Sequence, residues 1–154
     1  MNKRLVLDRF VPYRLSVLTN RVSSAIARHY SERFGLSIPE WRIMAVLGET
    51  PGLSAREVAA RTAMDKVQVS RAVASLIEAR RVERTPDDDD GRIGRLELTP
   101  KGRGAYEQIV PLALGLEEQF LSSLSVTERK LFERLLTKLA TSVERFPQAE
   151  QLEK

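Results

Sequence analysis

Apolar residues recur every three or four positions over the first part of the chain. The stripe consists of Leu7, Val11, Leu15, Leu18, Val22, Ile26 and Tyr30. This spacing predicts one long amphipathic helix over residues 7–35. Gly35 marks its end, because glycine readily adopts the left-handed conformation that follows many helices. Pro12 is expected in the first turn or at a kink, since proline lacks the backbone N–H that a helix interior uses.

The second helix is predicted to begin at Ser37, which stands three residues before Glu40 as in a capping box. The string ETPG at residues 49–52 is expected to end it. Its buried side is expected to consist of Trp41, Met44, Ala45 and Leu47.

A helix with two expected kink points follows Thr99 and Pro100, which fit the N-cap and the first helical position. It is predicted to run to about Ser123, and Pro111 and Gly115 are the expected kink points.

The last helix is predicted from a further capping box, Ser125 with Glu128. Its apolar stripe consists of Leu131, Phe132, Leu135, Leu136, Leu139, Ala140, Val143 and Phe146. Together with the first helix, this stripe exceeds the apolar surface that one small protomer can cover. The sequence therefore predicts a partner subunit.

The middle of the chain contains two short predicted helices, each opened by a pair with capping-box spacing: Ser54 with Glu57, then Asp65 with Gln68. Only residues 62–64 separate them, and two short helices joined by a tight turn form the helix-turn-helix pattern. The second helix is expected to bury Val67, Ala72, Val73, Leu76 and Ile77. Its outward face is expected to carry Lys66, Gln68, Ser70, Arg71 and Ser75.

The period changes from helical to two after this helix. The strings VERT and RLEL alternate apolar and polar residues around the turn-rich PDDDDGRIG, so residues 82–98 are predicted to form a β-hairpin. A helix-turn-helix followed by a hairpin is a winged helix. The predicted fold is therefore mainly α with a small β-hairpin wing. Residues 37–99 form its winged helix-turn-helix, and residues 7–35 and 100–146 supply the helices of a dimerisation lobe.

The composition is that of a folded globular protein, with 42% hydrophobic and 30% charged residues in 154. The net charge is +4, so the placement of the basic residues matters more than their number. The chain has no cysteine and one histidine, which excludes a thiolate nucleophile and argues against a catalytic triad or a zinc cage. We therefore expect neither an enzyme nor a cofactor or metal site.

The N-terminal string MNKRLVLDRFVPYRLSV resembles neither a signal peptide nor a membrane span. Asp8, Arg9 and Arg14 interrupt its apolar stretch, which is too short and too charged for either role. We expect a cytoplasmic protein without a membrane partner.

Three strings carry a family resemblance: LSIPEWRIMAVL, LSAREVAARTAMDKVQVSRAVASLIEARRVERTPD and DGRIGRLELTPKG. Together with the order of elements over roughly residues 10–146, they resemble the MarR family (multiple antibiotic resistance regulators), dimeric winged-helix transcription factors of bacteria and archaea. The family wing usually reads Asp-Arg-Arg, where this chain has Asp90, Gly91 and Arg92. The resemblance implies that Arg92 enters the minor groove of DNA and that Asp90 holds it. Gly91 stands at the first of these arginines, so one wing contact is expected to be missing and the wing to be more flexible.

Two interpretations of the acidic run at residues 87–90 stay open. In one, the Asp90 carboxylate orders the planar Arg92 guanidinium through a bidentate pair, and the other three aspartates accept backbone hydrogen bonds and point to solvent. In the other, all four are solvated turn residues. A calcium loop is not expected, because Pro86 would stand at its first position and has no side-chain oxygen.

The second helix of the helix-turn-helix, at about residues 65–80, is expected to enter the major groove. Lys66, Gln68, Ser70 and Arg71 are the candidate contacts to base edges, and Ser54, Arg56 and Arg84 the candidate phosphate contacts, beside Asp90 and Arg92 on the wing. The alternative is that these residues are the solvated face of an ordinary helix.

Six residues are candidates for an effector site: Tyr13, Arg14, His29, Trp41, Met44 and Tyr106. The family often binds small aromatic or anionic molecules between the helices that carry them, and an arginine among aromatic rings suits a carboxylate. The opening helix is also similar to that of members that regulate aromatic-acid catabolism, some of which sense aromatic acyl-CoA thioesters. Core packing with a surface arginine is an equal alternative for each residue.

These observations predict a homodimeric transcription factor that binds a pseudo-palindromic operator in double-stranded DNA. It is expected to be a repressor that a small aromatic or anionic effector releases, such as an aromatic acid or its CoA thioester. Two alternatives stay open. An architectural DNA-binding protein would show weak sequence preference and no effector response, and a winged helix used for protein contact would not use this face for DNA.

Overall fold

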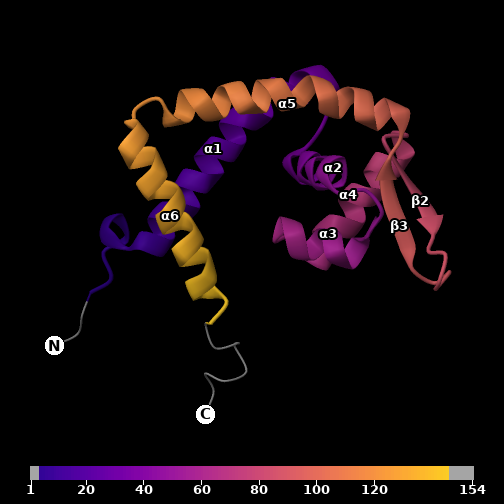
Figure 1. The fold of residues 1–154 in the computed structure, drawn as a ribbon, viewed down its shortest axis with the longest axis horizontal. Coiled ribbons are helices and arrows are strands. Elements are labelled where there is room, and N and C mark those ends of the chain that lie inside the picture. The colour runs from indigo at the N-terminus through magenta and orange to yellow at the C-terminus, as the bar shows by residue number, and fades with distance from the viewer. Residues whose placement is uncertain (1–3, 146–154) are drawn as a thin grey trace, which may run out of the picture. The chain divides into compact units, whose positions relative to one another are not determined.

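The computed structural model describes residues 4–145 (Figure 1). A 3₁₀ turn, η1 (Leu7–Arg9), precedes the first helix. The helices are α1 (Val11–Phe34), α2 (Ile38–Glu49), α3 (Ala55–Thr62), α4 (Lys66–Glu78), α5 (Pro100–Leu121) and α6 (Val126–Val143), and the strands are β1 (Leu53–Ser54), β2 (Val82–Pro86) and β3 (Gly94–Leu98). The chain folds as two compact units, Met1–Ala113 and Leu114–Lys154.

The first helix is shorter than expected. Phe10 has an extended backbone with φ −86° and ψ 105°, so Leu7 belongs to η1 and α1 begins only at Val11. Pro12 lies in the first turn of α1 as predicted, and Gly35 follows the helix in the left-handed conformation with φ 61°. Helix α6 ends at Val143, and Phe146, the last residue of its predicted stripe, lies outside the described residues.

The helix starts follow the predicted caps. Ser37, Ser54 and Ser125 each accept a hydrogen bond from the backbone N–H of the glutamate three residues later, and that glutamate accepts one from the serine's own N–H. Asp65 accepts from the Gln68 N–H at 2.8 Å, which confirms its cap, although only this half of the predicted box is found among the described residues. Thr99 accepts from the Gly102 N–H at 3.1 Å and so caps α5.

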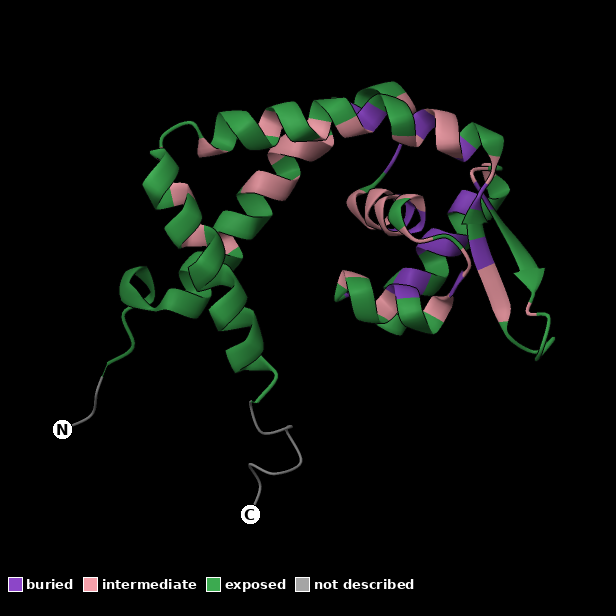
Figure 2. Cartoon of the chain, viewed as in Figure 1, coloured by how far each residue is buried: buried purple, intermediate pink, exposed green. Residues whose placement is uncertain are grey.

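The core of Met1–Ala113 lies between α2, α3, α4 and the sheet (Figure 2). From α4 it receives Val69, Ala72, Val73 and Leu76, which follow one another at the three- and four-residue steps of a single helix face. The predicted burial of Val67 and Ile77 is wrong, since both are exposed and Val69 takes the inward position instead.

The wing is part of a three-stranded antiparallel sheet with the order β1-β3-β2. The predicted hairpin is confirmed, with Val82 opposite Leu98 and Pro86 opposite Gly94. Strand β1, which pairs Leu53 with Leu96, was not predicted, because two residues are too few to show alternation. It anchors the start of α3 to the base of the wing.

The chain reverses direction between α4 and β2 at Arg80 and Arg81. Arg80 has a left-handed backbone with φ 56°, and the Arg81 N–H donates to the Leu76 carbonyl while the Arg80 N–H donates to Ile77. This is a Schellman motif built without glycine. The Arg81 carbonyl accepts from the Thr99 N–H at 3.0 Å, and the Arg81 guanidinium donates to the Phe34 carbonyl. One short segment therefore connects the ends of α1 and α4 with the starts of β2 and α5.

The unit Leu114–Lys154 contains the end of α5 and all of α6. Arg129 closes the turn between them, donating to the Leu121 carbonyl at 3.1 Å and pairing with Glu118 at 2.9 Å. The predicted apolar stripe of α6 is uncovered in the single chain, since its described leucines and Val143 are exposed (Figure 2). Across residues 4–145 no single helix is long and apolar enough to cross a membrane, and α5 and α6 pass that test only as a bent pair.

We predict that Gly102→Ala destabilises the protein and that Gly104→Ala stabilises it. A Cβ at Gly102 would lie 1.9 Å from the Arg81 carbonyl oxygen, whereas nothing lies within 4 Å of one at Gly104. Gly102→Ala should lower the free energy of unfolding by about 1–3 kcal/mol through overpacking. The second change should gain about 0.5–1 kcal/mol, because alanine is the better helix former.

Urea denaturation at one fixed protein concentration measures both changes. Equal stabilities of the two variants would contradict the close approach of Gly102 to Arg81.

Candidate nucleic-acid interface

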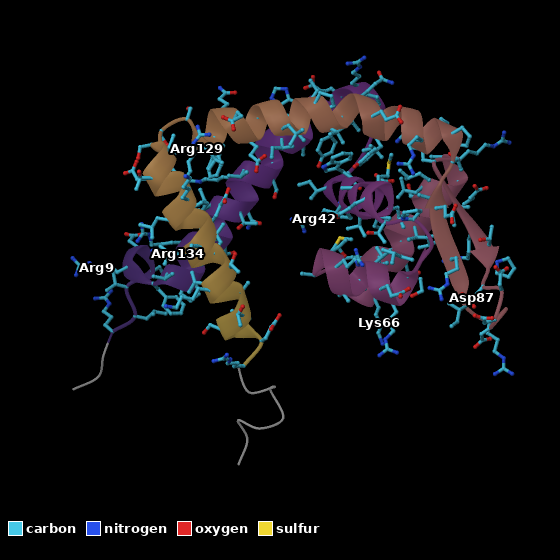
Figure 3. All side chains as sticks on the ribbon, viewed as in Figure 1. Arg9, Arg42, Lys66, Asp87, Arg129 and Arg134 are labelled. Atoms are coloured by element: carbon cyan, nitrogen blue, oxygen red, sulfur yellow. The ribbon has the colours of Figure 1, made fainter. Side chains whose placement is uncertain are left out.

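The outward face of α4 is open and, apart from the exposed Val67, mostly polar. Lys66, Gln68, Ser70 and Arg71 are all exposed as predicted, and Figure 3 shows Lys66 projecting outward. Among the described residues, no hydrogen bond or ion pair uses the side chains of these four residues. The start of α4 adds the positive end of the helix dipole, which favours nearby phosphate groups. This face can therefore meet a polyanion without first breaking contacts within the chain.

Ser75 was predicted on the same face but is tied to α2. Its hydroxyl donates to the Glu40 carboxylate at 2.5 Å, and Glu40 also caps α2 through Ser37. Burial raises the pKa of the Glu40 carboxyl, but the hydrogen bonds from Ser75 and Ser37 outweigh it and leave that pKa below its ordinary value. Ser75 thus helps to hold α4 against α2.

The wing contains an arginine that carries two ion pairs, and it is not the expected one. Arg95 on β3 pairs with Asp87 at 2.5 Å and with Glu57 at 3.0 Å. Glu57 completes the capping box of α3 with the N-cap residue Ser54, so Arg95 links the turn of the wing to the start of the helix-turn-helix. Hydrogen bonds from the Ser54 N–H and hydroxyl, with Arg95 nearby, lower the pKa of Glu57.

The predicted side-chain pair between Asp90 and Arg92 is wrong for this structure. The Asp90 carboxylate accepts from the backbone N–H of Arg92 at 3.1 Å, and the ion pairs of the described residues do not include the Arg92 guanidinium. Asp87, which was expected to point to solvent, is instead only 15% exposed at its side chain. Asp87 also accepts from the N–H groups of Asp89 and Asp90 at 3.0 Å, which confirms its predicted role in the turn. Figure 3 marks Asp87 at the end of the hairpin.

Gly91 is not required by the backbone of the wing. Its φ lies outside the left-handed region, and nothing lies within 4 Å of a Cβ built on it. Gly94 differs, because its Cβ would lie 2.6 Å from Cδ of Arg84. The missing side chain at Gly94 lets the stem of Arg84 lie across the hairpin.

The remaining predicted phosphate contacts lie at the start of α3. Arg56 is exposed, in the first turn of the helix. The Ser54 hydroxyl donates to Glu57 at 2.7 Å, so the capping box already uses it. Arg95 and Glu57 were absent from the predicted site, because 38 residues separate them in the chain and no local spacing signals their contact.

The six predicted effector residues do not form one site. Trp41 lies between Tyr30 and Tyr106, with ring centroids 5.6 and 6.1 Å apart, whereas Met44 is fully buried and His29 is exposed. Tyr13 lies on α1, 17 residues before Tyr30. At about 1.5 Å per residue this places it about 26 Å from the aromatic cluster along the helix. Tyr30 was missed as a member of the cluster because it also fits the apolar stripe.

Tyr13 and Arg14 line an open pocket of about 270 Å³ on the first half of α1. Its other lining residues are Asp8, Val17, Leu18 and Arg21. Two guanidinium groups beside an aromatic ring suit an anionic aromatic molecule. Arg21 was not predicted, although it follows Arg14 by seven residues and so shares its helix face. Within residues 4–145, no cluster of three or more histidine or acidic residues could hold a metal ion.

Comparisons with known proteins agree with this geometry. A sequence model described as the MarR family matches residues 34–93. The HTH-type transcriptional regulator BilQ of Clostridium symbiosum is 32% identical over 113 residues, which are 73% of this chain and 78% of BilQ. The HTH-type transcriptional repressor Rv2887 of Mycobacterium tuberculosis is 26% identical over 86% of this chain and 92% of its own length. The crystal structure of a MarR/EmrR family regulator from Acinetobacter sp. ADP1 superposes with a TM-score of 0.85 at 28% identity, covering 92% of this chain and all of the other.

We predict that Arg95→Ala raises the pKa of Asp87. Hydrogen bonds from the Asp90 N–H, the Arg95 guanidinium and the Asp89 N–H hold that pKa below its ordinary value of 3.8. A carboxyl with a lowered folded-state pKa stabilises the wing fully above the unfolded value, and this stabilisation is lost as the pH falls through the folded value. Without Arg95 the loss should therefore begin at a higher pH.

NMR titration of the Asp87 carboxyl carbon measures this pKa. Arg92→Ala is the control, because no ion pair joins the Arg92 guanidinium to Asp87. This change should leave the pKa of Asp87 as it is in the unaltered protein. An Asp87 titration that is the same with and without Arg95 would rule out the pair.

Proposed function

Because this chain belongs to the MarR family of transcriptional regulators, we propose that it binds a specific double-stranded operator as a homodimer and acts as a repressor that a small aromatic or anionic effector releases. The curated relatives BilQ and Rv2887 are named a transcriptional regulator and a transcriptional repressor. The fold supports DNA binding rather than catalysis, and family members are not enzymes.

The observation that carries this proposal is the open, mostly polar face of α4 beside the wing. Among the ion pairs of the described residues, none uses the guanidinium of Arg92 on that wing. Lys66, Gln68 and Arg71 stand at the start of a 13-residue helix that packs by its opposite face on α2 and α3. A recognition helix contacts base edges with its N-terminal residues in the major groove. Arg92 then reaches the adjacent minor groove, whose narrow regions attract arginine.

Each contact has a separate role in the proposal. Lys66, Gln68, Ser70 and Arg71 meet base edges, while Arg56 and Arg84 meet phosphates. The Ser54 hydroxyl already serves the capping box, so Ser54 contributes to phosphate binding only by positioning the first turn of α3. Asp90 shapes the loop by accepting the Arg92 N–H. Asp87 is neutralised by Arg95, which reduces the repulsion between the acidic run and the phosphates.

The homodimer is proposed from the uncovered apolar residues of the terminal helices. In the single chain, η1 and the start of α1 expose Leu7, Phe10, Val11, Leu15 and Leu18, and α6 exposes Leu131, Leu135, Leu136, Leu139 and Val143. A soluble protein rarely leaves so many large apolar side chains in water. A twofold dimer would hold two copies of α4 about one DNA turn apart, which calls for a pseudo-palindromic operator.

The effector is proposed to bind the pocket around Tyr13, Arg14 and Arg21, with its carboxylate or phosphate on the arginines. A protein of the same fold at 22% identity, BpsR of Bordetella bronchiseptica, has its DNA binding regulated by 6-hydroxynicotinic acid, which is an aromatic acid. An effector that binds the DNA-incompetent dimer more tightly by a few kcal/mol suffices to release the operator.

We predict that Arg71→Ala and Arg92→Ala each weaken operator binding by about 1–3 kcal/mol, since each removes a charged groove contact. Fluorescence anisotropy with the promoter region beside the protein's own gene, against scrambled competitor DNA, measures the loss. Exposed Arg28 on α1 provides the control, and Arg28→Ala should bind as the unaltered protein does.

Equal affinity of the unaltered protein for operator and scrambled DNA would favour the architectural alternative. No binding even at low salt would exclude both DNA-binding proposals and favour the protein-contact alternative.

We further predict that Arg14→Gln and Arg21→Gln each raise the effector concentration needed for release by about tenfold or more, because a charged hydrogen bond contributes about 1.5–3 kcal/mol. Aromatic acids and their CoA thioesters are titrated into the protein–operator complex and release is followed by anisotropy. Arg28→Gln, on the same helix but outside the pocket, should respond as the unaltered protein does. If both pocket variants release the operator at the same effector concentration as the unaltered protein, the effector binds outside this pocket.

A further inference from the structure

Val67 is the most exposed large apolar side chain of the winged helix-turn-helix module at residues 37–99. Its exposure is 58%, against 38% for Ile77 and for Ile93. Valine is also a poorer helix former than the straight-chain residues, because its branched Cβ restricts the side chain in a helix. Neither the core nor the stability of α4 therefore accounts for a valine at this position.

The helix geometry places Val67 at the centre of the outward face. The buried residues Val69, Ala72, Val73 and Leu76 define the inward direction of α4. At about 100° per residue, Val67 lies about 170° around the helix from their mean direction. Arg71, one turn later, lies on the same side. Val67 is thus the side chain of the first turn that points most directly away from the core.

The surroundings of Val67 limit what it can contact. Lys66 and Gln68 flank it in sequence, and Ser70 and Arg71 follow within one turn, all exposed. A polar groove with phosphates on both sides suits these neighbours. The two methyl groups of Val67, in contrast, would need an apolar partner there. The major groove offers one such group on a base edge, the C5-methyl of thymine.

We propose that Val67 is a specificity-determining residue that packs against the C5-methyl group of one thymine in each half of the operator. The inference rests on the proposed DNA binding and adds a base identity to it. A methyl contact distinguishes T·A from C·G and from the reversed A·T pair, because only the thymine side carries the methyl group at that place in the groove.

The test begins with the full-length protein and a random library of duplex DNA, from which bound sequences are selected. Each thymine of the selected site is then replaced by deoxyuridine, which removes the methyl group and leaves the base-pairing edge unchanged. Binding is measured for the unaltered protein, for Val67→Ala and for Ile77→Ala. Ile77 is the matched control, an exposed apolar residue ten positions later on α4, about 15 Å further along the helix.

We expect one uracil position per half-site to weaken binding of the unaltered protein about fourfold, which corresponds to about 0.8 kcal/mol for one buried methyl group. Replacing both half-sites should weaken it about sixteenfold. Val67→Ala should bind the thymine site more weakly and lose most of the difference between thymine and uracil. Ile77→Ala should retain that difference.

Three results would overturn the inference. A selected site without a constant T·A pair in each half, or a uracil effect that persists in Val67→Ala, would reject the methyl contact while leaving sequence-specific binding intact. A library from which no sequence is enriched would reject the proposed function itself, and the inference with it.

Discussion

The contact between the Arg81 carbonyl and the start of α5 holds the DNA-binding module together. This carbonyl accepts the Thr99 N–H, and the close approach leaves no room for a side chain at Gly102. On the other side of the same residue, the guanidinium donates to Phe34 at the end of α1. Three elements distant in sequence therefore meet at one residue. Together with the shared core, this junction fixes the ends of α1 and α4 to the starts of β2 and α5.

The electrostatics of the wing follow from a second long-range contact. Four aspartates in a row would repel DNA if all were solvated. The structure instead places Asp87 against Arg95, and Arg95 also pairs with Glu57, so one positive charge is shared by two of the carboxylates near the expected phosphate path. Arg92 stays outside this network. Asp87 thus orders the wing, and the Arg92 guanidinium stays available for the proposed contact with the minor groove.

The terminal helices α1 and α6, unlike the winged helix-turn-helix, leave many large apolar side chains exposed in the single chain. Only Tyr30 of α1 is buried, and no described residue of α6 is. An apolar stripe of this size beside a complete core in the other unit is the observation on which the proposed homodimer rests. The pocket at Tyr13 and Arg14 lies on this uncovered half of α1, so an effector there would act where the proposed dimer forms.

Local chemistry made the helices, their caps and the hairpin predictable from sequence. A capping box such as Ser125 with Glu128 spans three residues, so its spacing is visible without knowledge of the fold. The inward side of α4 was partly predictable: Val69 precedes Ala72 and Val73 by three and four residues and so shares their helix face, whereas Val67 does not. The expectation for Val67 therefore failed on the helical spacing and not for lack of a signal. Contacts between distant segments, such as Arg95 with Glu57, left no trace in local spacing. They exist because β3 lies between β1 and β2, and strand order is a property of the folded chain.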